Sequence, residues 1–91
     1  MSTNQKTSKN EYKNLVETGV SAYKKKDYKT SYNCFSSIAN SKDSKFKYDT
    51  KFYLAKQYEN GLGLLKNYSK AFDLYLQVFN NVSKYKYIAK I

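Results

Sequence analysis

The 91-residue chain contains no histidine, arginine, tryptophan or proline, and it has a single cysteine. Without histidine, no side chain has an ordinary pKa that suits a general base near neutral pH. Cys34 has no histidine to activate it as a nucleophile, and a lone cysteine cannot form an intramolecular disulfide. The seven carboxylates are dispersed and lack the spacing of an acid–base pair or an oxygen-ligand metal site. We therefore predict a protein that is not an enzyme and that uses no metal or cofactor.

Long apolar runs are also missing, so the sequence predicts no transmembrane helix. The N-terminal residues are polar and basic, and they lack the apolar core of a secretory signal peptide. A lone cysteine fits a reducing compartment. We expect an intracellular, cytoplasmic protein, with import into an organelle as an open alternative.

Lysine and tyrosine dominate the residues that are present. All seventeen basic residues are lysines, the net charge is +10, and there are eleven tyrosines. Such a charge attracts phosphate groups or an acidic partner, although a general compositional bias towards Lys, Asn, Tyr and Ile is the competing interpretation. Tyrosine rings belong at the edge of a core or on a binding surface, because the hydroxyl needs water or a partner.

Apolar residues recur at helical spacing from residue 11 onward and predict a single all-α domain over 11–91, after a flexible basic arm over 1–10. We expect helices over about 11–25 and 28–39, a third that ends near Gly61, a fourth from Tyr68 to Val82, and a short closing helix over 83–90.

Residues at the expected helix ends are suited to capping. Asp27 is placed to cap the second helix and Asn67 the fourth, while Asp43 or Ser44 is placed to cap the third. Gly19 lies inside the first helix, where glycine costs about 1 kcal/mol relative to alanine. We therefore expect a neighbouring helix to approach closely at Gly19.

The second and fourth helical segments follow one pattern at a separation of 40 residues. The first and third match less well at a separation of 36, which keeps the small pair Gly19/Ala55. Self-similarity near this period is typical of a solenoid of helical hairpins. The stronger match consists of the pairs Asp27/Asn67, Tyr28/Tyr68, Ser31/Ala71, Tyr32/Phe72, Phe35/Tyr75, Ile38/Val78 and Ala39/Phe79.

The second copy resembles the SEL-one-like branch of the tetratricopeptide-repeat superfamily, and the first is similar to the plain tetratricopeptide pattern. Ala55 and Leu74 depart from the glycine and tryptophan of the SEL-like pattern. The resemblance implies one SEL-like repeat over about 48–82 and one degenerate repeat over about 12–46. The signature residues are Gly19, Tyr28 and Phe35 in the first copy, and Leu54, Ala55, Tyr58, Gly61, Gly63, Lys70, Ala71 and Tyr75 in the second.

The resemblance also implies a fold and a set of structural roles. Two antiparallel helix-turn-helix hairpins, over 11–40 and 44–82, would stack as a short right-handed α-solenoid. Small residues would let paired helices approach, and aromatic residues, Tyr68 among them, would fill the space between hairpins. Two hairpins form a short array, so self-association or incorporation into a larger complex is a reasonable expectation.

The function that the resemblance implies is protein–protein interaction by an adaptor or scaffold. The first helix of each hairpin would line a concave face, where apolar side chains flanked by lysines suit an acidic peptide or helix. Projected onto this sequence, that face consists of Lys13, Val16, Val20, Tyr23, Lys24, Phe52, Lys56 and Glu59.

Two alternatives stay open. The first is RNA binding within a ribonucleoprotein, in which tyrosines stack on bases and lysines neutralise phosphates. Its candidate residues are Lys24, Lys25, Lys26, Lys29, Lys84, Tyr85, Lys86 and Tyr87. The second is attachment of the basic segment 83–91 to an anionic membrane surface.

Overall fold

The computed structural model describes residues 9–41 and 46–90, and within them it contains four helices and no strand. The helices are α1 (Lys9–Lys24), α2 (Tyr28–Ala39), α3 (Lys47–Asn60) and α4 (Tyr68–Lys90). This confirms the predicted all-α class for the described part of the chain. None of these helices is long and apolar enough to cross a membrane.

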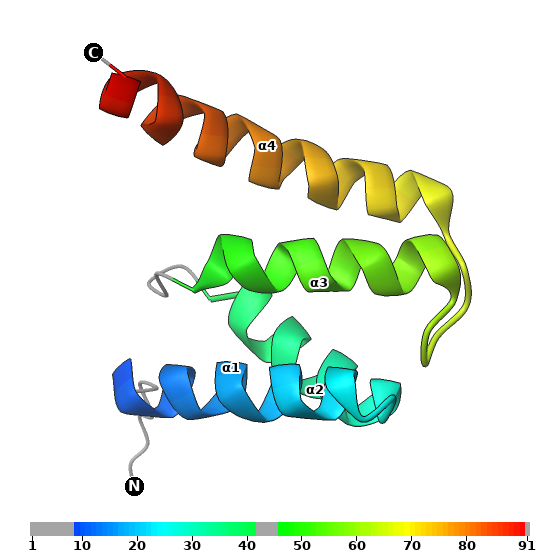
Figure 1. Cartoon of the computed structure of the whole chain (residues 1–91). Helices are drawn as coiled ribbons and strands as arrows, with labels where there is room; N and C mark the ends of the chain where they lie inside the picture. The colour runs from blue at the N-terminus through cyan, green and yellow to red at the C-terminus, as the bar shows by residue number, and fades with distance from the viewer. Residues whose placement is uncertain (1–8, 42–45, 91) are drawn as a thin grey trace, which may run out of the picture.

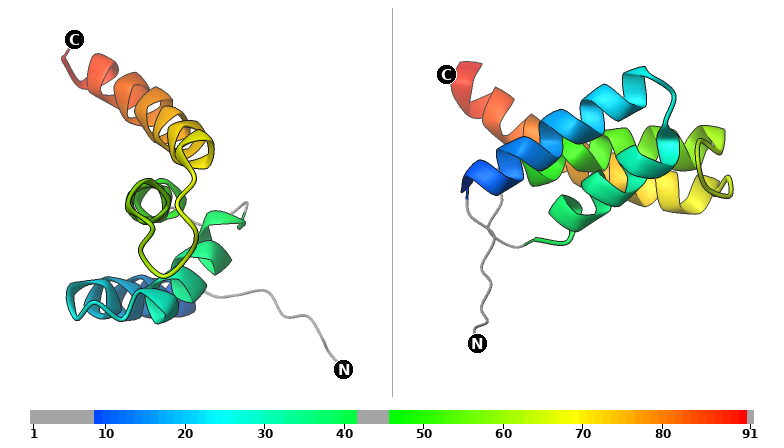
Figure 2. Two further views of the ribbon diagram at one scale, coloured as in Figure 1. Left: turned by 90° about the vertical axis from the view of Figure 1, so that its right-hand side faces the viewer. Right: turned by 90° about the horizontal axis from the view of Figure 1, so that it is seen from below.

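Each helix packs against the next one in the chain, and the chain reverses direction between them (Figure 1). The helices α1 and α2 lie side by side in one layer, α3 lies on this layer, and α4 lies beyond α3 (Figure 2). Towards its C-terminal end α4 diverges from α3 (Figure 1). One side of α4 is therefore covered by α3, and its other side faces outward.

Two of the predicted caps are confirmed. The Asp27 carboxylate accepts from the Thr30 N–H at 3.4 Å, and the Asn67 side-chain oxygen accepts from the Lys70 N–H at 3.0 Å. Gly61 ends α3 in the left-handed conformation at φ 65°, as the sequence predicts.

Three of the predicted boundaries need correction. The helix α1 begins at Lys9, so it includes two residues of the expected arm, and residues 1–8 lie outside the described part. The helix α3 begins after Phe46 without a side-chain cap, and Asp43 and Ser44 lie outside the described residues. No separate closing helix exists, because α4 continues unbroken to Lys90. The physical reason is that the segment 80–90 contains no glycine or proline to end a helix.

The centre of the core is a cluster formed by Phe35, Leu54, Ala55 and Leu74, which come from α2, α3 and α4. Phe35 is fully buried and stacks on Tyr53, with ring centroids 5.0 Å apart. A Cβ atom at Gly19 would lie 2.5 Å from Cε1 of Phe35, which is much closer than van der Waals contact. The expected close approach at Gly19 is therefore confirmed, and the neighbour is the Phe35 ring of α2.

The loop 61–67 is attached to the start of α2 by a buried glutamine. Gln57 is fully buried, and its Nε2 donates to the Tyr28 carbonyl at 3.0 Å and to the Leu62 carbonyl at 3.1 Å. Gly63 has φ 77°, and a Cβ there would lie 2.8 Å from the carbonyl carbon of Tyr28. The backbone of this loop therefore packs directly on α2, which explains why glycine stands at position 63.

Candidate functional site

The helices α1, α3 and α4 share a face on which α2 is absent (Figure 2, left). This face contains a cavity of about 500 Å³, hereafter the α1–α3–α4 groove, lined by Val16, Val20, Tyr48, Phe52, Tyr53 and Val78. Three residues of the predicted concave face, Val16, Val20 and Phe52, come together here. Phe52 is 41% exposed, so an apolar ring from α3 is accessible in the groove.

The three predicted lysines are not part of the groove lining, but they lie near its apolar residues along the helices. Lys56 places its ammonium group 5.1 Å from the centroid of the Phe52 ring. Lys13 and Lys24 are exposed on α1, at helical spacing from Val16 and Val20. The lysines are thus available to a ligand that reaches the apolar part of the groove.

Two predicted residues, Tyr23 and Glu59, are occupied by contacts within the fold and do not line the groove. Tyr23 packs edge-on against Tyr53 at 5.2 Å, and burial, together with Tyr28 and Tyr53, raises its pKa. Glu59 accepts a hydrogen bond from the Tyr75 hydroxyl at 2.7 Å. Burial, followed by this hydrogen bond and the Glu59 charge, raises the pKa of Tyr75 to about 12.

Sequence reasoning missed several residues of the groove. Tyr48, Asp49 and Tyr53 lie on α3 next to the predicted positions, and Val78 comes from α4, which the projection did not include. Asp49 places one carboxylate in the lining. The Lys47 ammonium lies 5.2 Å from the Tyr48 ring centroid, so one positive charge lies near this end of the groove.

An apolar stripe runs along the outward side of α4, and it also was not predicted. Its members are Tyr68, Phe72, Leu76 and Phe79, which are 65%, 63%, 44% and 65% exposed. The expectation that Tyr68 fills space between hairpins is therefore wrong. Exposed apolar residues that cluster in this way mark interaction surfaces in soluble proteins.

The sequence pairs two residues of this stripe with residues of α2 at a separation of 40 positions. In α2 the position equivalent to Phe72 is Tyr32, whose ring packs on Tyr58 of α3 at 6.3 Å. The position equivalent to Phe79 is Ala39, which is partly buried. Tyr32 thus packs on α3, whereas Phe72 and Phe79 are exposed on α4.

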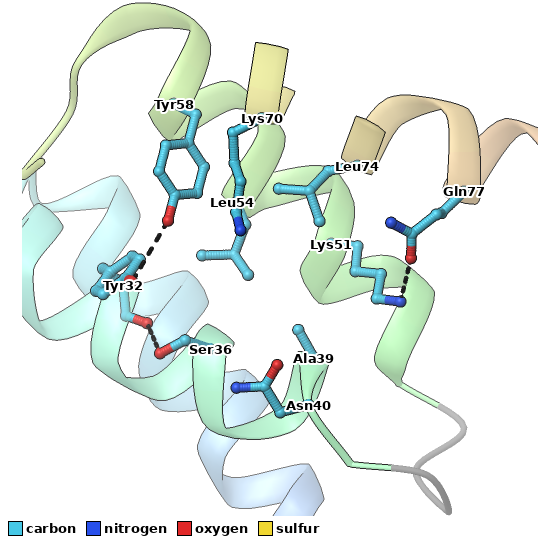
Figure 3. Close-up of a pocket in the computed structure, with 10 residues that line it drawn as sticks. All are labelled: Tyr32, Ser36, Ala39, Asn40, Lys51, Leu54, Tyr58, Lys70, Leu74 and Gln77. Atoms are coloured by element: carbon cyan, nitrogen blue, oxygen red, sulfur yellow. Dashed lines mark hydrogen bonds between the residues drawn. The ribbon is translucent and has the colours of Figure 1, made fainter. Parts of the chain in front are cut away.

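A second cavity lies between α2, α3 and α4, hereafter the α2–α3–α4 pocket (Figure 3). Its volume is about 290 Å³, and the polar residues around it include Tyr32, Asn40, Lys51, Tyr58, Lys70 and Gln77. The Tyr32 and Tyr58 hydroxyls are 3.4 Å apart, and Lys51 donates to Gln77 at the other side of the pocket (Figure 3). The sequence pattern does not indicate this combination of residues, because they come from three different helices.

The two lysine–tyrosine clusters of the RNA-binding alternative lie far apart. Lys24, Lys25, Lys26 and Lys29 are exposed around the turn from α1 to α2. The segment 84–87 lies towards the C-terminal end of α4, at the opposite end of the molecule (Figures 1 and 2). The fold therefore does not join the two clusters into one continuous track.

Cys34 is buried in α2, and burial raises the pKa of its thiol. A thiol with a raised pKa holds less of the reactive thiolate near neutral pH. Cys34 therefore lacks the environment of an activated nucleophile.

Comparisons of the chain with protein-family models, with curated proteins and with solved structures find no match. The tetratricopeptide resemblance therefore depends on the residues and the repeat pattern of this chain alone.

Proposed function

We propose that this protein is a non-catalytic helical-repeat adaptor that binds an acidic helix or peptide of a partner protein in the α1–α3–α4 groove. In this proposal α1–α2 and α3–α4 are the two hairpins of a short right-handed α-solenoid of the tetratricopeptide type. Support for the hairpins comes from the tight packing of Gly19 on Phe35 and of Gly63 on α2, at positions of the repeat signature.

The observation that carries the proposal is the chemistry of the groove. Val16, Val20 and Phe52 supply an accessible apolar surface from two helices, and the Lys56 ammonium lies beside the Phe52 ring, while the one charged residue of the lining itself is Asp49. An amphipathic helix with acidic flanks can bury its apolar face on such a surface while its carboxylates approach the ammonium groups. The net charge of +10 also favours encounter with an acidic partner.

Affinity capture from the native cell tests this proposal, using the charge-reversed variant Lys24→Glu/Lys56→Glu. Its matched control is Lys25→Glu/Lys29→Glu, which changes the net charge equally at exposed positions outside the groove. We expect the groove variant to lose a partner that the wild type and the control both retain. If both variants retain or both lose the same partners, the groove is not the binding site.

Nuclease treatment of the captured material separates the adaptor proposal from the RNA-binding alternative. A protein partner held through the groove should remain after RNA is digested. Loss of all partners on digestion would contradict the adaptor proposal and would favour a ribonucleoprotein component.

A further inference from the structure

Among the described residues, the lining of the α2–α3–α4 pocket has two positive charges and no carboxylate. Lys51 of α3 and Lys70 of α4 both line it, and none of its lining residues is aspartate or glutamate. Lys51 donates one hydrogen bond to Gln77, which leaves two of its three ammonium donors for a ligand. The Lys70 ammonium lies 6.0 Å from the centroid of the Tyr58 ring, and within the described residues no carboxylate pairs with it.

Neutral donors complete the polar side of the pocket. The Asn40 and Gln77 carboxamides face the cavity together with the Tyr32 and Tyr58 hydroxyls (Figure 3). Burial, then the hydrogen bond and charge of Tyr32, raises the pKa of Tyr58 to about 12, so its hydroxyl keeps its proton near neutral pH. The apolar side is formed by Leu54 and Leu74, which belong to the core.

We propose that the α2–α3–α4 pocket binds a phosphate monoester. A phosphomonoester carries close to two negative charges near neutral pH and has three acceptor oxygens, which match two ammonium groups and several neutral donors. Lysine binds phosphate as a point charge, without the fixed geometry that arginine supplies. The volume of about 290 Å³ accommodates a phosphoryl group on a small stem, and the stem would contact the leucines.

This site goes beyond the proposed adaptor function, since the pocket shares no lining residue with the α1–α3–α4 groove. The phosphoryl group could belong to a small free molecule or to a phosphorylated side chain of another protein. Both sources present the same group to Lys51 and Lys70, and they differ only in what lies outside the pocket.

Titration of the isotope-labelled full chain, followed by NMR, tests the proposal. The ligands are free phosphoserine, a short peptide that contains phosphoserine, and acetate as a monoanionic comparison. We expect saturable shifts at amides around the pocket, and we expect affinity to fall about tenfold for each of Lys51→Gln and Lys70→Gln. The control Lys25→Gln removes the same single charge from an exposed position outside the pocket and should bind phosphoserine as the wild type does.

Each outcome decides the question. Binding of the peptide and of free phosphoserine with similar affinity supports the site and a small-molecule source, and tighter binding of the peptide supports the site and a protein source. Equal weakening in the pocket and control variants, acetate binding as tight as phosphoserine, or no saturable shift would each overturn the proposal. Lys70 is exposed, so Lys70→Gln should leave the fold intact. A loss of affinity in this variant alone can therefore be attributed to the binding site and not to unfolding.

Discussion

Replacing Gly19 by alanine sets helix propensity against packing, and the structure indicates which effect is larger. Alanine should stabilise the interior of α1 by about 1 kcal/mol relative to glycine. The new Cβ, however, would lie 2.5, 2.9 and 3.0 Å from three atoms of the Phe35 ring. That ring is fully buried and stacked on Tyr53, so it cannot move aside without disturbing the core. Overpacking of this kind costs about 1–3 kcal/mol, so we expect a net loss of stability of up to about 2 kcal/mol.

Thermal and urea unfolding followed by circular dichroism measure this difference. In a domain of this size a loss of 1 kcal/mol lowers the Tm by about 4–8 °C. The control is Gly19→Ala in a Phe35→Leu background, where the ring atoms that would clash are absent. There the alanine should be neutral or stabilising, and the difference between the two backgrounds is the coupling energy of the pair. If Gly19→Ala stabilises the wild-type chain, the close packing of α1 on α2 inferred from the structure is wrong.

Three further changes test other contacts. Gln57→Ala empties a fully buried position and removes the Nε2 donor from the Leu62 and Tyr28 carbonyls, of which Tyr28 keeps the Ser31 hydroxyl, and should cost about 1–3 kcal/mol in urea unfolding. Asn60→Ala, at an exposed position, should stay within about 0.5 kcal/mol. Lys26 follows α1 with φ 68°, a backbone conformation that strains lysine but not glycine. Lys26→Gly should therefore stabilise the folded protein by about 0.5–1 kcal/mol. An unchanged or lower Tm would contradict this expectation. Burial raises the pKa of Tyr58 and Tyr75 from 10.0 to about 12, so their neutral forms favour the folded state. Their contribution to stability is full below about pH 10 and is lost as the pH rises to about 12, which phenolate absorbance and unfolding at several pH values will follow.

The helices and most of their ends could be predicted because their signals are local. Asp27, Asn67 and Gly61 act within one turn of the helix end that they cap, so the sequence pattern alone identifies them. The unusual position of Gly19 predicted a close neighbour, although the pattern could not say that the neighbour is Phe35. The prediction of a separate closing helix over 83–90 was wrong, because α4 continues to Lys90. The sequence contains no residue there that would end a helix, and the break was expected only because a helical array needs its open end covered.

The candidate sites were harder to predict, since each depends on contacts between helices distant in sequence. Val16, Val20 and Phe52 were placed on one face by the repeat resemblance, but the contribution of Val78 depends on how α4 crosses α3. The α2–α3–α4 pocket brings together Lys51 and Lys70, which have no relation in the sequence pattern. Side-chain spacing along one helix predicts neighbours on that helix only.

The exposed stripe on α4 raises the question of which surface holds a partner, and the salt dependence of binding can answer it. Contacts with the lysines around the α1–α3–α4 groove are electrostatic and should weaken as salt rises, since at 1 M salt the Debye length is only about 3 Å. Contacts with Phe72 and Phe79 are apolar, and excluded salts such as sulfate strengthen apolar burial. We therefore expect the affinity for a groove-bound partner to fall when sodium chloride is raised. An affinity that is constant or increases with salt would mean that the partner instead covers the exposed apolar side chains of α4.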